Sequence, residues 1–158
     1  YDRNGTNLCA VVRSLPSQSY GPLMQKIHIR HHVLQGVKPS ENRGDFKTKA
    51  NENYYEYKFS VCSKDGRTNF VQIREWHKCD YVLEILNLED EFELYLVPKK
   101  AMTKLVKNHG GLAHGTKDTI ADNKKREYAL RPKVGGNCWR QLQKYKTTRE
   151  ELSKLYER

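Results

Sequence analysis

Long apolar runs are missing from this chain of 158 residues. No stretch approaches the roughly 18 consecutive apolar residues that a membrane-spanning helix needs, so the sequence predicts no membrane segment. Only 37% of the residues are hydrophobic, and ten tyrosines supply part of the ring packing that a core requires. The length is that of one domain with its own core, so we expect a single domain spanning residues 1–158.

Cysteine is scarce as well. The chain has Cys9, Cys62, Cys79 and Cys138, with no C-x-x-C pair. A disulfide framework is not expected from such scattered cysteines, and we expect a reducing, cytoplasmic compartment. A zinc site built from His77, Cys79 and Cys62 stays open as an alternative, although buried cysteines more often act as small apolar side chains.

Negative charge is scarce in the C-terminal part. Residues 1–98 hold 13 Lys or Arg and 13 Asp or Glu, whereas residues 99–158 hold 16 and 6. The whole net charge of +10 therefore belongs to the second segment. Such an asymmetry fits a surface that binds a phosphate backbone; a solubilising basic surface is the alternative, and charge alone does not separate the two.

Two strands are predicted at residues 44–49 and 54–61, with a turn at residues 50–53 between them. Side chains two apart in a strand share a face. Glu56 and Lys58 therefore project together, while Tyr57, Phe59 and Val61 point the opposite way into a core.

Pairing of these strands as a hairpin brings Asp45 beside Glu56. Two carboxylates at close range repel each other unless a cation lies between them. Oxygen ligands suit Mg²⁺, with Mn²⁺ as a substitute, and a lysine such as Lys58 can orient water for metal-assisted hydrolysis. The alternative is a solvated hairpin face that carries an ordinary Glu–Lys pair.

Asp45 followed by Glu56-Tyr57-Lys58 resembles the signature of the PD-(D/E)XK nuclease superfamily, with Gly44 in place of the proline usually written before the first aspartate. The resemblance covers residues 20–98. It implies an α/β (α+β) fold with a restriction-endonuclease-like core, in which helices flank a central mixed β-sheet. Residues 20–98 would form the catalytic core, and residues 99–158 a basic subregion that contacts DNA.

The resemblance further implies a Mg²⁺-dependent endodeoxyribonuclease of the type II restriction kind, acting on double-stranded DNA as a homodimer. Asp45, Glu56 and the Tyr57 carbonyl would hold the ion, Lys58 would position the attacking water, and Gln72 would lie near the metal. No small-molecule cofactor is expected. The alternatives are a homing, repair or phage-type nuclease, and a non-catalytic nucleic-acid-binding module.

Contacts with DNA are expected from polar and basic side chains that come after the two strands at residues 44–49 and 54–61 in the chain. A glycine-containing loop at residues 109–117 and a basic run at residues 123–126 can approach phosphates closely. Arg74 has an ion pair with a neighbour as its alternative role. The predicted DNA-contacting residues are Arg74, His114, Thr116, Lys117, Lys124, Lys125, Arg126, Arg131 and Lys133.

The remaining elements follow from periodicity and caps. We expect a helix that starts at Gly21-Pro22 and ends at Gly36. His28, His31 and His32 are expected on its surface, with a role as metal ligands as the alternative. A strand over 70–76 is expected to place Gln72, Arg74 and Trp76 on one face. Further elements are expected as strands 81–88 and 92–97, helix 99–108, strand 128–133, helix 138–145, and a last helix that begins with the capping box Thr148-x-x-Glu151.

Overall fold

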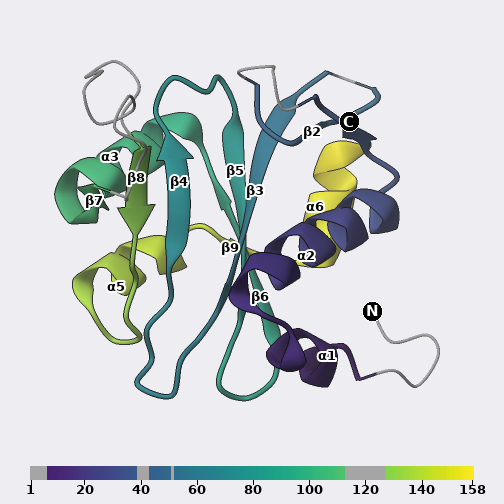
Figure 1. Cartoon of the computed structure of the whole chain (residues 1–158). Helices are drawn as coiled ribbons and strands as arrows, with labels where there is room; N and C mark the ends of the chain where they lie inside the picture. The colour runs from purple at the N-terminus through teal and green to yellow at the C-terminus, as the bar shows by residue number, and fades with distance from the viewer. Residues whose placement is uncertain (1–6, 39–42, 51, 113–126) are drawn as a thin grey trace.

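The computed structural model describes residues 7–38, 43–50, 52–112 and 127–158. A mixed sheet with the strand order β1-β2-β3-β5-β6-β9 runs through its centre, and helices cover both faces (Figure 1). These strands are β1 (Gln35–Gly36), β2 (Phe46–Lys47), β3 (Tyr54–Val61), β5 (Asp80–Leu86), β6 (Phe92–Val97) and β9 (Lys146–Thr147). The predicted α/β (α+β) class, with a mixed central sheet flanked by helices, is confirmed.

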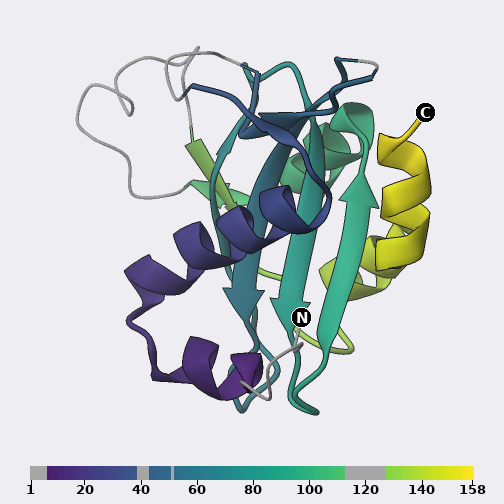
Figure 2. The same cartoon turned by 90° about the vertical axis from the view of Figure 1, so that its right-hand side faces the viewer.

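A second, three-stranded sheet and the helices make the outer layers. The sheet has the order β4-β8-β7, and its strands are β4 (Phe70–Arg74), β8 (Glu127–Leu130) and β7 (Gly111–Leu112). The helices are α1 (Leu8–Ser14), α2 (Ser17–His31), α3 (Lys99–His109), α5 (Asn137–Gln143) and α6 (Arg149–Tyr156). In Figure 2, α2 crosses in front of the central sheet and α6 runs alongside it at the right-hand edge.

The core lies on both faces of the central sheet because β5 is buried on both sides. Tyr81 and Leu83 of this strand belong to the apolar cluster shared with α3, α5 and the three-stranded sheet. Val82 and Leu86 belong to the opposite cluster, which α2 and α6 cover. β5 pairs in parallel with β3 and antiparallel with β6, so the sheet is mixed at its centre.

β3 has the two faces that the sequence predicts. Tyr57 and Phe59 pack into the cluster beneath α2 and α6, whereas Glu56 and Lys58 project from the opposite face and form an ion pair. β2 pairs antiparallel with β3 only at Tyr54 and Tyr55. Among the described strands, none pairs with this edge of β3 beyond those two residues.

The helix before the first strand differs from the prediction at both ends. α2 begins at Ser17, ends at His31 and contains Pro22 in its interior. Gly36 does not end the helix; it lies in β1, opposite Phe46 of β2. The placement of His28 on the helix surface was wrong, because His28 and Met24, four residues apart on one face, are fully buried against the sheet.

β4 also departs from simple alternation. Phe70 and Ile73 are both buried although they are three residues apart, because the ladder to β8 shifts register between them. Gln72 lies in this bulge with a φ of +55°, a conformation rare for residues other than glycine. The expected common face of Gln72, Arg74 and Trp76 is therefore interrupted, and β4 ends at Arg74.

The later elements follow the sequence closely. The antiparallel pair β5–β6, the helix α3 with Met102, Leu105 and Val106 inside, and β8 are all present. The side chain of Thr148 accepts a hydrogen bond from Glu151 N at 3.2 Å and caps α6. No helix of the described part of the chain combines the length and apolar character needed to cross a membrane.

Candidate active site at the start of strand β3

Gly44 allows the chain to approach β3 closely just before Asp45. Its φ is +92°, in the region that favours glycine, and a Cβ at this position would lie 2.5 Å from the carbonyl oxygen of Tyr55. The next residue, Asp45, donates its backbone N–H to that same oxygen at 2.8 Å. The glycine at this position thus has a local structural reason.

The hairpin places Asp45 beside Glu56, because β2 and β3 pair with Phe46 opposite Tyr55. Oδ2 of Asp45 accepts a hydrogen bond from the backbone N–H of Tyr57 at 2.8 Å. Burial raises the pKa of Asp45, the Tyr57 N–H lowers it, and the negative charge of Glu56 raises it further, so that the net shift is upward. A half-buried carboxylate and a buried one therefore repel each other here, which is the electrostatic condition for cation binding.

Glu56 is held by two donors, one on each oxygen. Oε1 lies 2.8 Å from Lys58 Nζ, and Oε2 lies 3.0 Å from His77 Nδ1. The Glu56 side chain is only 4% exposed. Burial alone would raise its pKa, but the hydrogen bonds from His77 and Lys58, with the charge of Lys58, outweigh burial and lower the pKa. The ionised form is thus favoured in a buried position.

His77 and Cys79, which the sequence suggested as zinc ligands, contact Glu56, and that contact was not expected. Both lie in the connection between β4 and β5 and are buried. Cys79 Sγ lies 3.9 Å from Glu56 Oε2, and the ligand atoms of Glu56, His77 and Cys79 all lie within 4.8 Å of one another. The prediction that Cys62 joins His77 and Cys79 in a zinc site was wrong. Cys62 lies just beyond the opposite end of β3, where its thiol donates to Ser63 O at 3.5 Å.

Lys58 and Gln72 line a hollow of about 990 Å³ that extends from β3 to α2, β4 and the segments flanking β4 and β8. The Lys58 side chain is 16% exposed, so it is not enclosed in an apolar interior. The Tyr57 side chain points to the other face, where its hydroxyl donates to Glu84 Oε1 at 2.6 Å. Only the backbone of Tyr57, between Glu56 and Lys58, is available on the side of the carboxylates.

Two of the predicted DNA-contacting residues line the same hollow. Arg131 and Lys133 join Lys58 and Arg67 there, and none of the described lining residues is an aspartate or glutamate. Arg67 is partly neutralised by Asp65 at 3.0 Å. The hollow is therefore a cationic groove, and we use that name for it below. It lies along the part of β3 that β2 leaves unpaired.

The other predicted contacts divide into two groups. Arg74 Nε forms an ion pair with Glu127 Oε1 at 3.1 Å, which is the alternative role that the sequence left open. The remaining residues fall outside the described part of the chain: they are His114, Thr116, Lys117, Lys124, Lys125 and Arg126.

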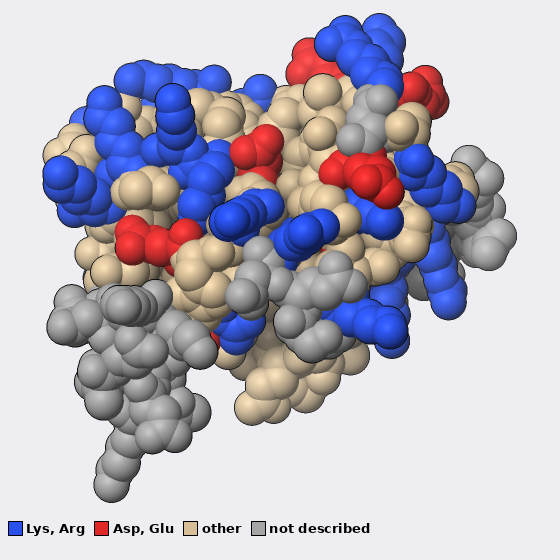
Figure 3. All heavy atoms as spheres, turned by 90° about the horizontal axis from the view of Figure 1, so that it is seen from above, with Lys and Arg blue, Asp and Glu red and all other residues tan. Residues whose placement is uncertain are grey.

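Basic side chains also gather away from the groove. Figure 3 shows Lys and Arg concentrated on the side of α3 when the molecule is viewed from the end that carries β2. Lys100, Lys104 and Lys107 of α3 are exposed there. The basic excess of residues 99–158 is thus in part a surface of α3.

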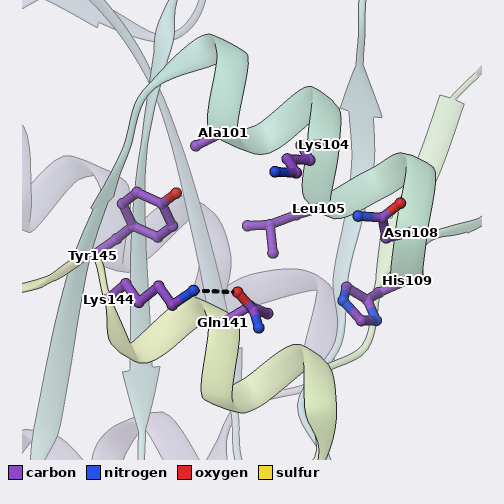
Figure 4. A pocket seen from close by; sticks show the side chains of 8 residues that line it. All are labelled: Ala101, Lys104, Leu105, Asn108, His109, Gln141, Lys144 and Tyr145. Atoms are coloured by element: carbon purple, nitrogen blue, oxygen red, sulfur yellow. Dashed lines mark hydrogen bonds between the residues drawn. The ribbon is translucent and has the colours of Figure 1, made fainter.

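A smaller hollow of about 310 Å³ lies between α3 and α5. Figure 4 shows Lys104 and His109 on α3 facing Lys144, whose Nζ donates to Gln141 Oε1 at 2.7 Å. No lining residue carries a carboxylate, so this hollow lacks the one or two carboxylates through which Mg²⁺ is usually bound. The carboxylates of β2 and β3 remain the better candidate for metal chemistry.

Comparison with known protein families finds no match to this chain, and a search of curated proteins finds no significant relative.

Proposed function

We propose that this chain is a metal-dependent endonuclease of the PD-(D/E)XK kind that hydrolyses phosphodiester bonds of double-stranded DNA. The observation that carries the proposal is the convergence of Asp45, Glu56 and Lys58 on one face of β3, directly beside a groove with basic residues and no described acidic ones. A solvated hairpin face would leave the Glu–Lys pair in water, whereas Glu56 is almost completely buried.

A divalent ion fits the donors that are present. Asp45 and Glu56 supply hard oxygen ligands, and the upward pKa shift of Asp45, caused by burial and by the charge of Glu56, is an electrostatic cost that a cation would remove. When bound, such an ion polarises the phosphate and lowers the pKa of water. Mg²⁺ is the expected ion, and Mn²⁺ has similar ligand preferences.

The protein groups would act around that ion in distinct ways. Asp45 and Glu56 hold it, and the Tyr57 backbone fixes the carboxylate of Asp45. Lys58 orients the attacking water and offsets negative charge on the phosphate. The water oxygen forms a bond to phosphorus, the bond to the 3′ oxygen breaks, and the products are a 5′ phosphate and a 3′ hydroxyl. Gln72, which lines the groove with Lys58, is placed to contact the substrate strand.

The cationic groove supports a nucleic acid as the substrate. Lys58, Arg131 and Lys133 line it, and such side chains bind the phosphate backbone with little regard to sequence. Cleavage of both strands of a duplex requires two active sites, so we propose that the chain acts as a homodimer and serves restriction of foreign DNA. Homing, repair or phage recombination would use the same chemistry on another substrate.

The test is incubation of the purified chain with plasmid and phage DNA in Mg²⁺ or in EDTA. We expect fragments in Mg²⁺ only, and discrete bands if cutting is site-specific. Glu56→Gln should lower the cleavage rate by at least about a hundredfold while DNA is still bound. Glu89→Gln, which alters an exposed turn carboxylate, is the matched control and should cut normally.

Two results would reject the nuclease proposal. One is the absence of metal-dependent cleavage of duplex, branched and single-stranded DNA by a chain that binds DNA, which would leave a non-catalytic binding module. The other is equal cleavage by the wild-type chain and the Glu56→Gln variant, which would point to a contaminant or to another site.

A further inference from the structure

Glu56 belongs to two sets of ligands at once. On one side it faces Asp45, and on the other its Oε2 contacts His77 Nδ1 at 3.0 Å and Cys79 Sγ at 3.9 Å. Glu56, His77 and Cys79 are all buried. In the part of the chain that the structure describes, this is the single cluster of three or more His, Cys, Asp or Glu with metal-ligand spacing.

The second set differs in chemistry from the first. Mg²⁺ is bound almost entirely through oxygen, whereas a thiolate, an imidazole and a carboxylate together suit Zn²⁺ and similar transition metals. Zinc sites with three protein ligands commonly keep a fourth position for water or substrate. The separations among the three ligand atoms require only small side-chain adjustments to surround one ion.

The three ligands come from two parts of the fold. His77 and Cys79 lie in the irregular connection between β4 and β5, whereas Glu56 lies in β3, which pairs with β5. The other three described cysteines have different neighbours: Cys9 donates to Asp90 O at 3.1 Å, Cys62 donates to Ser63 O, and Cys138 packs against the apolar cluster that includes Leu142. The combination of thiol, imidazole and carboxylate therefore occurs at one place.

We propose that Glu56, His77 and Cys79 form a binding site for a thiophilic transition metal ion of the Zn²⁺ class. Binding releases the Cys79 thiol proton to solvent and replaces the His77 hydrogen bond to Glu56 with a shared metal. Because Glu56 cannot serve both ligand sets fully, this ion competes with Mg²⁺ and inhibits hydrolysis. The competition rests on the proposed nuclease function, whereas the binding itself does not.

Binding is tested with Co²⁺ as a spectroscopic probe added to the metal-free, full-length chain in the absence of DNA. We expect saturation at one equivalent with a thiolate-to-cobalt charge-transfer band. Cys79→Ser should abolish the band. His77→Asn should weaken Co²⁺ binding by at least about tenfold, because loss of a residue that only hydrogen-bonds a metal ligand already lowers metal affinity by about that factor. Cys62→Ser, which removes a buried cysteine outside the cluster, is the matched control and should keep the band.

Absence of the charge-transfer band in the wild-type chain, or its survival in Cys79→Ser, would overturn the proposal and leave His77 and Cys79 as groups that only position Glu56. Thermal unfolding of each variant separates loss of the site from loss of the fold.

Competition is tested by titrating Zn²⁺ into the Mg²⁺-dependent cleavage reaction. Each variant is compared with its own rate without Zn²⁺. The concentration of Zn²⁺ for half-inhibition should rise at least about tenfold in Cys79→Ser, and it should rise with Mg²⁺ concentration in the wild type. Unchanged inhibition in Cys79→Ser would overturn the competition. If the wild type does not cleave DNA, the nuclease proposal fails while the Co²⁺ result still decides the metal site.

Discussion

At the scale of single residues, hydrogen-bond donors explain how the carboxylates of Asp45 and Glu56 can lie close together away from water. Asp45 and Glu56 would repel each other in isolation, yet each has defined donors: the Tyr57 N–H for Asp45, and Lys58 with His77 for Glu56. A buried charge is tolerated when it is hydrogen-bonded and paired. The pairs therefore keep Glu56 ionised without water, and that is the state a metal ligand needs.

Gly44 gives a prediction for stability. Gly44→Ala should lower the free energy of unfolding by more than about 2 kcal/mol, because alanine at φ +92° is strained and its Cβ would collide with the Tyr55 carbonyl. Urea unfolding monitored by circular dichroism measures the change.

Gly21→Ala is the control for that substitution. Gly21 lies inside α2, and an alanine Cβ there would meet nothing within 4 Å, so the substitution should stabilise the chain by up to about 1 kcal/mol. Equal effects of the two substitutions would contradict the role assigned to the close approach at Gly44.

His28 gives a prediction for pH dependence. Burial, with the nearby charges of His32 and His31, lowers the pKa of His28 to about 3, against about 6.5 in an unfolded chain. The folded state therefore binds fewer protons, and stability present above pH 6.5 is lost as the pH falls toward 3. The loss attributable to His28 is about 1.4 kcal/mol per pH unit below 6.5.

Unfolding free energies at pH 7 and pH 5 check this value. The free energy of unfolding of the His28→Gln variant should fall less steeply between these pH values than that of the wild type. The comparison cancels the contributions of groups common to both proteins. An identical fall in both would show that His28 does not take up a proton on unfolding. His32, whose pKa burial and His31 lower to about 4, should contribute to the remaining slope with the same sign.

At the scale of elements, the bulge in β4 places Gln72 in the lining of the cationic groove. Phe70 and Ile73 anchor the strand in the core, while Val71 and Gln72 are turned outward. Residues held in rare backbone conformations gather at functional sites, and the bulge directs Gln72 to the groove that Lys58 also lines.

Gln72→Ala should lower the rate of DNA cleavage by at least about tenfold, because a misplaced substrate strand loses alignment with the carboxylates, while the affinity for DNA changes little. Val71→Ala, a truncation of the exposed neighbour in the same bulge, should leave the rate nearly unchanged. Single-turnover cleavage and filter binding give the two quantities. A rate for Gln72→Ala equal to that of the control would remove Gln72 from the site.

Features that depend only on residues close together in the sequence could be predicted from it. The alternation of β3, the apolar face of α3 and the Thr148 cap of α6 each depend on neighbours within a few residues, and each is present as expected. Asp45 beside Glu56 followed from a short hairpin. The start of α2 and the burial of His28 did not follow, because packing against the sheet overrides the local signals of Gly21 and Pro22.

The contact of Glu56 with His77 and Cys79 also could not be predicted. It depends on the parallel register of β3 and β5, in which Tyr55 lies opposite Asp80. That register is set by the two apolar clusters of the whole fold and leaves no trace in the spacing of Glu56 and His77. The Arg74–Glu127 pair is likewise a product of the β4–β8 ladder.

At the scale of the whole molecule, basic side chains gather in the groove and on α3. The groove collects Lys58, Arg131 and Lys133, and α3 adds an exposed row of lysines. These two surfaces would attract a long polyanion.

Salt dependence of DNA binding tests this arrangement. Arg131→Ala combined with Lys133→Ala should weaken binding and reduce the slope of log K against log salt by about 0.9 for each phosphate that the variant no longer neutralises. Lys154→Ala combined with Arg158→Ala removes the same charge from exposed positions at the C-terminal end of the chain and is the matched control. Equal slopes in the two double variants would place the DNA elsewhere.

The parallel pairing of β3 with β5 has a consequence during synthesis. A growing polypeptide that has reached only residue 79 carries Asp45, Glu56, Lys58 and Gln72 but has no β5 against which to align β3. Its carboxylates have no complete sheet to hold them, so the nascent chain on the ribosome cannot assemble the face that carries Glu56 and Lys58. The fold delays the appearance of that face until the downstream half of the polypeptide has been made.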